Sequence, residues 1–372
     1  MKVLLSGGGT AGHINPLIAI AECIKEKYPD CELLFAGTPF GMEAKLIPDA
    51  GYDFTPITVR GFQRGFTPSD FAKNIRAVFN LMSAMPKAEK IMKDFKPDIV
   101  IGSGGYVCGP IMKAAIKYGA KTAMHESNAF PGVTTKLVSK DVDVVMVVNS
   151  EAIRHLPEGT NCVITGNPIS SDFFSKTKSE SRKELGIDED KFVVLSYGGS
   201  LGAGKINETV NDLILWEQDY SDIYHIHSFG KMGKDTFVKS LEDKGVFPNS
   251  NPRLDIREYI NNMPTCMTAA DLVICRAGAM TLSQILAIGL PSILIPSPVV
   301  AENHQYKNAK VLEDNNAGIV IEQVNLTSDL LIEKVKDLYL YRDKLKDISA
   351  NAKRIAVIDA RERIIEQISK LI

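Results

Sequence analysis

The sequence predicts an α/β protein built from two Rossmann-like halves that face a cleft. Three observations lead to this prediction. Apolar, strand-like runs alternate with helical patterns along the whole chain, which is typical of parallel βαβ units. The length of 372 residues exceeds what a single hydrophobic core usually supports. Each half also opens with a strand that runs directly into a glycine-rich loop.

Short runs rich in aliphatic residues mark the expected strands. In the first half they are Lys2–Leu5, Glu32–Ala36, Asp98–Ile101, Lys121–His125, Val142–Val148 and Cys162–Thr165. In the second half they are Phe192–Tyr197, Ile223–Phe229, Leu254–Glu258, Leu272–Cys275, Ser292–Ile295 and Gly318–Ile321.

The turn Gly166-Asn-Pro168 and the polar residues after it separate the two sets of strands. We therefore predict an N-terminal domain over residues 1–165 and a C-terminal domain over residues 166–349. The last helical pattern is expected to form one helix from about Leu340 to Ile372, and its part over residues 350–372 could return to the first domain.

Composition and charge exclude several classes of protein. The chain is 45% hydrophobic and 24% charged, as soluble globular proteins are, and its net charge of −2 offers no general attraction for nucleic acid. Its six cysteines are scattered without CxxC pairs, which indicates reduced, buried thiols. No run approaches the ~20 apolar residues of a membrane span, and the apolar stretch before Ser6 is too short for a signal peptide. We therefore expect a protein in the cytosol or at the periphery of a membrane, with no nucleic-acid partner.

The first glycine-rich loop, Ser6-Gly-Gly-Gly-Thr-Ala-Gly-His13, follows the first expected strand and opens into a helical pattern. It contains GxGxxG, the fingerprint of dinucleotide binding. That function also needs an acidic residue at the end of the second strand, where Phe35-Ala-Gly-Thr38 has none and Glu43 comes too late. The loop can still bind an anion at a helix amino terminus. His13 lies inside it, which favours a catalytic or ligand-orienting role over a place in the core.

Two more glycine-rich loops follow later strands. Three of the four residues Gly102–Gly105 are glycine, which favours a ligand over a simple tight turn. The loop Gly198–Lys205 fits the P-loop pattern GxxxxGK from Gly199, but Ile206 stands where a Ser or Thr would hold magnesium. We therefore expect Ser200 and nearby backbone amides to bind a phosphate group at the start of the next helix.

The stretch Ala270–Ala309 contains two expected strands, each followed by a polar loop. The first loop begins at Arg276 and leads into a helical pattern that includes Gln284, and the second loop carries His304 and Gln305. Ligands of parallel sheets bind beyond the carboxyl ends of the strands, where helix amino termini expose free N–H groups. Loops with amides and hydroxyls but little net charge suit a sugar nucleotide.

Histidines and carboxylates elsewhere leave alternatives open. Glu126, in the motif His125-Glu-Ser-Asn128, could act as a general base or cap a loop. His225 and His227 alternate on one strand face and could bind a metal, but no third ligand is near them in the sequence, which favours ordinary strand residues. The sequence has no HExxH, cysteine-cluster or paired-aspartate motif. We therefore predict no metal, and expect helix dipoles and amides to stabilise leaving-group charge.

A basic amphipathic segment runs from Phe62 to Met85. Its apolar residues recur at near-helical spacing, and lysines and arginines border them. Such a segment can lie on an anionic membrane surface, or it can form a core-facing helix with a solvated basic side. The residues alone favour the core-facing helix.

A series of motifs extends over almost the whole chain in a specific order: Gly8-Gly-Thr-Ala-Gly-His13, Gly41-Met-Glu43, Gly104-Gly-Tyr-Val-Cys-Gly-Pro110, His125-Glu-Ser-Asn128, Gly166-Asn-Pro168, Gly198-Gly-Ser-Leu-Gly-Ala203, Cys275-Arg-Ala-Gly-Ala279 and Gln305-Tyr-Lys-Asn-Ala309. Their order and spacing resemble the MurG family, the UDP-N-acetylglucosamine:muramyl-pentapeptide-diphosphoryl-undecaprenol glucosaminyltransferases. The resemblance implies the GT-B arrangement of two Rossmann-like domains, with the sugar nucleotide held mainly by the second. It also implies an inverting transfer of N-acetylglucosamine from UDP to the 4-hydroxyl of an undecaprenyl-linked muramyl-pentapeptide, without a cofactor.

The resemblance also implies a role for particular residues. His13 or Glu126 would remove the proton of the attacking hydroxyl, and the Phe62–Met85 segment would contact the membrane, which implies a peripheral protein on the cytoplasmic side of the cell membrane. The residues implied to face the acceptor diphosphate are Gly104, Gly105 and Tyr106. The residues implied to contact the UDP-sugar are Thr10, Ala11, Gly12, Asn128, Ser200, Ile260, Ala279, Met280, Thr281, Leu282, Ser283, Gln284 and Gln305.

One departure from the family concerns the ribose. Gln284 stands where the family usually has a Glu that binds the ribose hydroxyls, and an amide can still bond a diol without charge. Two alternatives of the same fold remain, which are a related transferase with another acceptor and a UDP-sugar 2-epimerase. A non-catalytic scaffold that binds sugar nucleotides would bind UDP without turnover.

Overall fold

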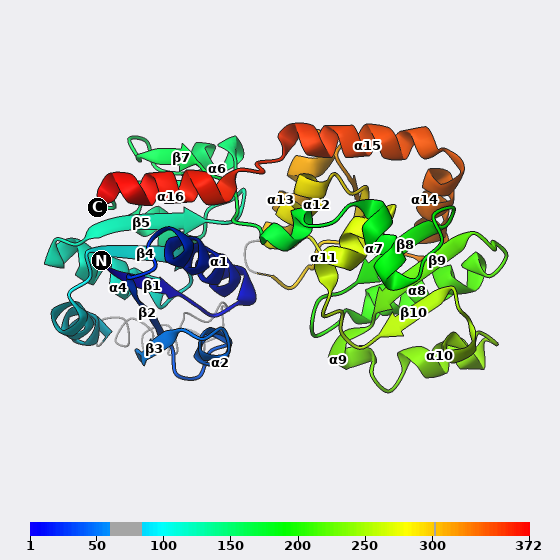
Figure 1. Ribbon diagram of the computed structural model, residues 1–372, viewed down its shortest axis with the longest axis horizontal. Helices are drawn as coiled ribbons and strands as arrows, with labels where there is room; N and C mark the ends of the chain where they lie inside the picture. Colours follow the sequence, from blue (N-terminus) through cyan, green and yellow to red (C-terminus); the bar gives the residue numbers. More distant parts are fainter. Residues whose placement is uncertain (60–83, 301–302) are drawn as a thin grey trace. The chain divides into compact units, whose positions relative to one another are not determined.

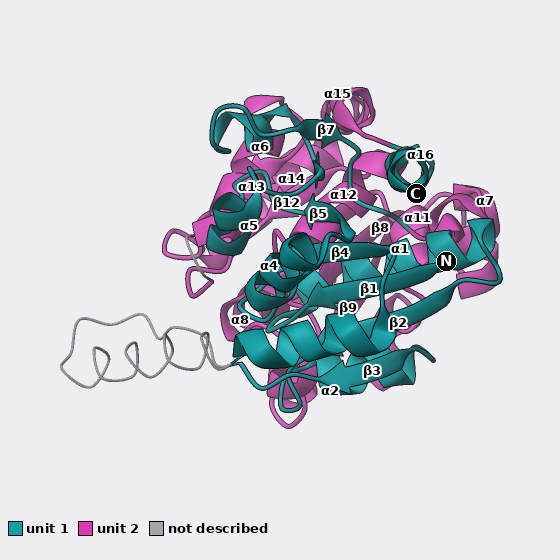
Figure 2. Cartoon of the chain, turned by 90° about the vertical axis from the view of Figure 1, so that its left-hand side faces the viewer, with its two compact units in different colours: residues 1–169, 358–372 teal, residues 170–357 magenta. Residues whose placement is uncertain are grey.

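The computed structural model describes residues 1–59, 84–300 and 303–372. The chain forms two compact units (Figures 1 and 2). Unit 1 comprises Met1–Ile169 together with Ile358–Ile372, and unit 2 comprises Ser170–Val357. In the described part of the chain, no helix is both long and apolar enough to cross a membrane.

Unit 1 is built on a seven-stranded parallel sheet with the strand order β3-β2-β1-β4-β5-β6-β7. The aliphatic runs form strands here because a parallel sheet is covered on both faces, so that almost every side chain is buried. The sheet pairs Gly7 of β1 with Gly104 of β4, and the first two glycine loops therefore begin side by side. The strands are β1 (Lys2–Gly7), β2 (Glu32–Gly37), β3 (Asp53–Pro56), β4 (Ile99–Gly104), β5 (Lys121–Glu126), β6 (Val144–Val147) and β7 (Cys162–Ile164).

Helices cover both faces of this sheet, because successive residues of a strand point to opposite sides. On one face, α1 (Ala11–Lys27) and α16 (Ala360–Leu371) share a core with Leu5. On the other face, α4 (Cys108–Tyr118) and the helical residues 84–95 share a core with Leu4. The shorter helices of unit 1 are α2 (Glu43–Asp49), α5 (Val133–Val138) and α6 (Ser150–Arg154).

Unit 2 is built on a six-stranded parallel sheet with the strand order β10-β9-β8-β11-β12-β13. Its strands are β8 (Phe192–Tyr197), β9 (Ile223–Ser228), β10 (Leu254–Arg257), β11 (Leu272–Cys275), β12 (Ser292–Leu294) and β13 (Ile319–Val320). Its helices are α7 (Lys178–Leu185), α8 (Gly204–Glu217), α9 (Gly230–Gly233), α10 (Phe237–Asp243), α11 (Met263–Ala269), α12 (Ala279–Ile288), α13 (His304–Asp314), α14 (Ser328–Leu340) and α15 (Arg342–Ile355). Two 3-10 turns, Ser171–Phe174 and Pro248–Ser250, complete the unit.

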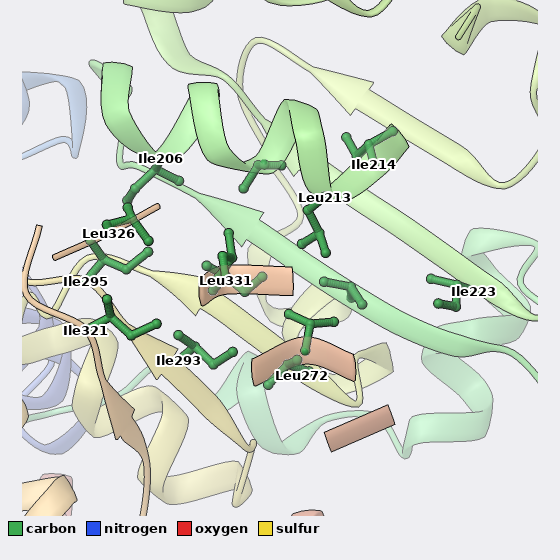
Figure 3. Packing of buried hydrophobic residues seen from close by; sticks show 14 of the residues in the cluster. Ile206, Leu213, Ile214, Ile223, Leu272, Ile293, Ile295, Ile321, Leu326 and Leu331 are labelled. Atoms are coloured by element: carbon green, nitrogen blue, oxygen red, sulfur yellow. The ribbon is translucent and has the colours of Figure 1, made fainter. Parts of the chain in front are cut away.

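The core of unit 2 allows a direct test of this packing. Leu213 of α8 is fully buried with Ile293 of β12 and Leu331 of α14 in one hydrophobic cluster (Figure 3). We expect Leu213→Ala to lower the free energy of unfolding by about 2–5 kcal/mol, because the lost contacts leave a cavity. Leu215→Ala on the same helix is the matched control, since that side chain is 40% exposed. Equal losses in chemical denaturation of the two variants would contradict the assigned core.

The predicted α/β fold class with two parallel sheets is confirmed, and each expected strand is present within a few residues of its predicted bounds. The strand β3 was not predicted, because its residues Asp53-Phe-Thr-Pro56 show no apolar run and lie at the edge of the sheet. The prediction of one helix from about Leu340 to Ile372 is wrong. Ala356 adopts an extended conformation after α15, and the chain passes from unit 2 to unit 1 before α16 begins (Figure 2).

Candidate active site

The first glycine loop connects β1 to α1 and holds the imidazole of His13. His13 Nδ1 lies 3.0 Å from the Gly8 carbonyl oxygen and 3.3 Å from Thr10 Oγ1. A carbonyl oxygen only accepts, so Nδ1 carries a proton and donates it to Gly8. In the neutral ring, Nε2 then has the free electron pair that a general base requires.

The second glycine loop connects β4 to α4 and interlocks with the first. Gly105 has a φ of +79°, and a Cβ added there would lie 2.2 Å from the Gly8 carbonyl oxygen. Only glycine therefore allows the two backbones to approach this closely. Ser103 Oγ donates to the His13 carbonyl oxygen at 2.6 Å, and the ring of Tyr106 lies against the first loop. The structure thus brings the predicted residues of both loops together in unit 1.

Glu43, the first residue of α2, forms a hydrogen bond to the backbone of the first loop. Its carboxylate is fully buried and accepts hydrogen bonds from the backbone N–H of Gly9 at 3.1 Å and from Thr38 at two atoms, the N–H at 3.0 Å and Oγ1 at 2.6 Å. From the sequence, Glu43 belongs to the motif Gly41-Met-Glu43 and lies too far along the chain to bind a dinucleotide, but no role in the first loop was predicted for it. Its position after the second strand and at the start of a helix was the signal that could have identified it.

Glu126 ends β5 and organises the loop that follows it. Its side chain is 2% exposed, and its two oxygens accept from the N–H and Nδ2 of Asn128, each at 3.0 Å, from the N–H of Gly132 at 3.0 Å and from Thr135 Oγ1 at 2.7 Å. A carboxylate has about four lone-pair sites, and these four donors occupy all of them on Glu126. Of the two roles considered from the sequence, this geometry corresponds to the loop cap.

His125, next to Glu126, lies inside unit 1. Its Nε2 lies 3.1 Å from the carbonyl oxygen of Gly166, and burial lowers the pKa of the imidazole. Asn167 Nδ2 donates to the carbonyl oxygen of Ser127 at 3.1 Å. These bonds fasten the turn at Gly166 to the end of β5, which explains why both motifs are polar in an otherwise apolar interior.

In unit 2, the third glycine loop connects β8 to α8. A Cβ at Gly202 would lie 2.3 Å from the carbonyl oxygen of Phe229, and one at Gly230 would lie 2.2 Å from the backbone nitrogen of Gly202. The loop is therefore locked to the end of β9, while Ser200 is exposed at its tip. The first turn of α8 has no acidic residue that would oppose the binding of an anion at its amino terminus.

The loops after β11 and β12 lie next to each other, because these strands pair in parallel. Arg276 donates from Nη1 to the carbonyl oxygens of Ile295 at 3.0 Å and Pro296 at 3.2 Å, and burial lowers the pKa of its guanidinium. Gln305 accepts from the N–H of Ser297 at 2.9 Å through Oε1. Arg276, for which no role was predicted from the sequence, therefore connects the two loops.

Residues of α12 and of the loop after β10 differ in exposure. Ala279, Met280, Thr281, Ser283 and Gln284 are partly exposed, and the first turn of α12 has no acidic residue. Leu282 and Ile260, in contrast, are 4% and 2% exposed. Their side chains belong to the packed interior, so only their backbone groups are suited to contact a ligand.

His225 and His227 are fully buried residues of β9. Ser196 Oγ lies 2.7 Å from His225 Nε2 and 2.7 Å from His227 Nδ1, and His225 Nδ1 lies 2.7 Å from a carboxylate oxygen of Glu217. Burial and the neighbouring His225 hold the pKa of His227 well below its usual range. The described residues contain no group of three or more side chains suited to hold a metal ion.

The predicted Phe62–Met85 segment lies outside the described residues except for its last two positions. Ala84 is buried and Met85 is half-buried against the core of unit 1. The following residues 84–95 are helical, with Ala88 and Met92 buried.

Comparisons with known proteins agree with this architecture. Residues 3–147 match the glycosyltransferase family 28 N-terminal domain, and residues 193–365 match the glycosyltransferase family 28 C-terminal domain. The chain is 44% identical over 371 residues to the UDP-N-acetylglucosamine–N-acetylmuramyl-(pentapeptide) pyrophosphoryl-undecaprenol N-acetylglucosamine transferase of Acetivibrio thermocellus, covering 100% of this chain and 98% of that protein. The protein of the same name from Clostridioides difficile is 41% identical, with 100% of this chain and 89% of that protein covered.

Solved structures show the same fold. The crystal structure of MurG from Acinetobacter baumannii superimposes with a TM-score of 0.79 at 27% identity, covering 99% of each chain. A UDP-GlcNAc 2-epimerase from Neisseria meningitidis superimposes with a TM-score of 0.66 at 13% identity over the full length of both chains, which shows a shared fold alone. With two matched domains and full-length relatives at this identity, the chain belongs to the MurG family of glycosyltransferases.

Proposed function

We propose that this chain transfers N-acetylglucosamine from UDP-N-acetylglucosamine to the 4-hydroxyl of undecaprenyl-diphospho-N-acetylmuramyl-pentapeptide, a step of peptidoglycan synthesis. The observation that carries this proposal is the full-length alignment, at 36–44% identity, with relatives named for this transfer. The polar glycine loops of both units supply the anion-binding backbone groups that two diphosphate substrates require.

In the proposed reaction, the acceptor hydroxyl oxygen attacks C1 of the sugar and its proton passes to Nε2 of His13. The bond between C1 and the diphosphate oxygen breaks, and UDP leaves with the electron pair from the opposite face. We assign the base to His13 because its Nδ1 is held by the carbonyl oxygen of Gly8, which leaves Nε2 to accept a proton. Glu126, the other candidate, accepts four hydrogen bonds within its own loop.

The proposed substrate contacts are those that the resemblance to the MurG family implies, and the exposure of each residue decides whether its side chain or its backbone would make the contact. In unit 2, Ser200 and the amino termini of α8 and α12 would stabilise the departing diphosphate. Gln284 would bond the ribose hydroxyls, and the backbone of Ile260 would contact the uracil. The remaining donor contacts are proposed at Thr10, Ala11, Gly12, Asn128, Ala279, Met280, Thr281, Leu282 through its backbone, Ser283 and Gln305, and the acceptor contacts at Gly104, Gly105 and Tyr106.

We propose a peripheral association with the cytoplasmic face of the cell membrane through the Phe62–Met85 segment. The names of the relatives include an undecaprenol-linked acceptor, and a lipid-linked substrate must be reached at a membrane surface. The apolar residues of the segment and its basic side chains, Arg64, Lys73 and Arg76, are of the type that binds anionic lipid.

The decisive experiment incubates the purified protein with radiolabelled UDP-N-acetylglucosamine and a short-chain lipid-linked muramyl-pentapeptide. We expect label to move into the lipid phase only when the acceptor is present. UDP binding without transfer would point to another acceptor. Consumption of the donor in the absence of any acceptor would instead indicate an epimerase.

A further inference from the structure

The first glycine loop contains a continuous chain of hydrogen bonds from a buried carboxylate to His13. His13 Nδ1 lies 3.0 Å from the Gly8 carbonyl oxygen, and the Gly9 N–H lies 3.1 Å from Glu43 Oε2. The Gly8 carbonyl and the Gly9 N–H belong to the same peptide group. Carboxylate, peptide and imidazole are therefore connected in series.

The directions of these bonds follow from what each atom can do. A carboxylate accepts, so the Gly9 N–H donates to Glu43, and the Gly8 carbonyl accepts from His13 Nδ1–H. Resonance couples the two ends of a peptide group, so an anion at the N–H increases the negative charge on the carbonyl oxygen. A more negative carbonyl is a better partner for the imidazole, above all when the ring carries a positive charge.

The surroundings of Glu43 make this effect strong. The side chain is fully buried, and its other oxygen accepts from the N–H and Oγ1 of Thr38. Within the described parts of the chain, no Lys, Arg or His forms an ion pair with this carboxylate, so its charge is balanced by neutral donors alone. A Cβ at Gly8 would lie 2.5 Å from Glu43 Oε1, which shows how closely the carboxylate approaches the loop. Tyr106, from the loop before α4, is a further titratable side chain that lies against this loop.

We propose that Glu43 is a positioning residue that acts on His13 through the Gly8–Gly9 peptide. It fixes the proton on Nδ1, so that Nε2 faces the acceptor, and it stabilises the imidazolium that forms when Nε2 takes the proton of the hydroxyl. In this role Glu43 touches no substrate and acts only through the Gly8–Gly9 peptide. This inference rests on the proposed function, in which His13 is the base.

The test compares pH–rate profiles of the full-length wild type, Glu43→Gln, Thr38→Val, His13→Ala and the double variant Glu43→Gln/His13→Ala. We expect Glu43→Gln to lower kcat by about 10–100-fold, with a smaller change in the KM for the donor. The acidic limb of its profile should move to lower pH, because the imidazolium loses the support of a negative charge. Thr38→Val is the matched control, since it removes a hydrogen bond from the same carboxylate but keeps the charge. It should not move the acidic limb to lower pH.

The double variant separates this inference from the proposed function. If Glu43 acts through His13, the double variant is no slower than His13→Ala, and an additive loss overturns the proposal. An acidic limb that Glu43→Gln leaves in place also overturns it. Transfer by His13→Ala at the rate of the wild type would remove the base assignment itself, and a wild type without transfer would remove the proposed function.

A measurement on the wild type holds even if Glu43→Gln fails to fold. Nitrogen-15 NMR of histidine-labelled protein, with the His13 signals assigned by their loss in His13→Ala, reports which ring nitrogen carries the proton. A proton on Nδ1 in the neutral ring supports the proposed chain of hydrogen bonds from Glu43 to His13. A proton on Nε2 overturns it, since Nδ1 could then not donate to Gly8.

Discussion

Replacement of His13 by alanine is expected to lower the turnover of transfer by about 10²-fold or more and to leave UDP binding largely intact. The expectation follows from the proposed base role, because neither of the two carboxylates described in these loops, Glu126 and Glu43, can take over the proton without rearrangement of its surroundings. Glu126 is saturated with hydrogen bonds, and Glu43 is buried beneath the loop. Single-turnover transfer, measured beside UDP binding by calorimetry, separates the loss of chemistry from a loss of affinity.

A second variant at the same position distinguishes chemistry from structure. His13→Asn retains an N–H group that can donate to the Gly8 carbonyl oxygen, so it restores the anchor of the loop without restoring Nε2. We expect it to be as slow as His13→Ala. Recovery of transfer in His13→Asn would mean that the histidine only shapes the loop, and near-normal turnover in both variants would remove it from the mechanism.

The fold was largely predictable because its sheets are parallel and buried. Runs such as Phe192–Tyr197 are buried along their whole length, so the apolar pattern alone identifies them. The edge strand β3 escaped prediction because an edge is only half covered and tolerates polar residues and proline. The continuous helical pattern near the carboxyl end concealed a break at Ala356–Asp359, because its cause is the passage from unit 2 to unit 1 and not a local glycine or proline.

The sequence was sufficient to predict which loops form the candidate site, but not what each side chain in those loops does. Glycine runs after strands mark where anions bind, since the backbone geometry they require is local. The roles of Glu43 and Glu126 depend on which donors surround each carboxylate. Glu43 contacts Gly9, which is 34 positions away in the chain, and no sequence pattern expresses that contact. Burial likewise separates Leu282 from its exposed neighbours in α12, although the resemblance to the family treats them alike.

Gly105→Ala is expected to reduce transfer at least as severely as the loss of His13. The substitution places a Cβ on a backbone with a φ of +79°, which costs about 1–2 kcal/mol in an L-residue. It also brings that Cβ to 2.2 Å from the Gly8 carbonyl oxygen, the atom that holds His13. The atoms that the new Cβ would meet belong to the backbone of Gly8, so no flexible side chain can move aside. The two loops must therefore separate, and His13 Nδ1 loses its hydrogen bond to the Gly8 carbonyl oxygen.

The matched control for this prediction is Gly119→Ala, at the end of α4. Gly119 has a φ of +85°, but a Cβ there would meet nothing within 4 Å. The two variants therefore share the backbone strain, and only Gly105→Ala adds the collision. We expect thermal denaturation to show a similar or larger loss of stability for Gly105→Ala, and transfer assays to show near-normal turnover for Gly119→Ala alone. If Gly105→Ala also transferred N-acetylglucosamine at the rate of Gly119→Ala, the close approach of the two loops would not be what positions His13.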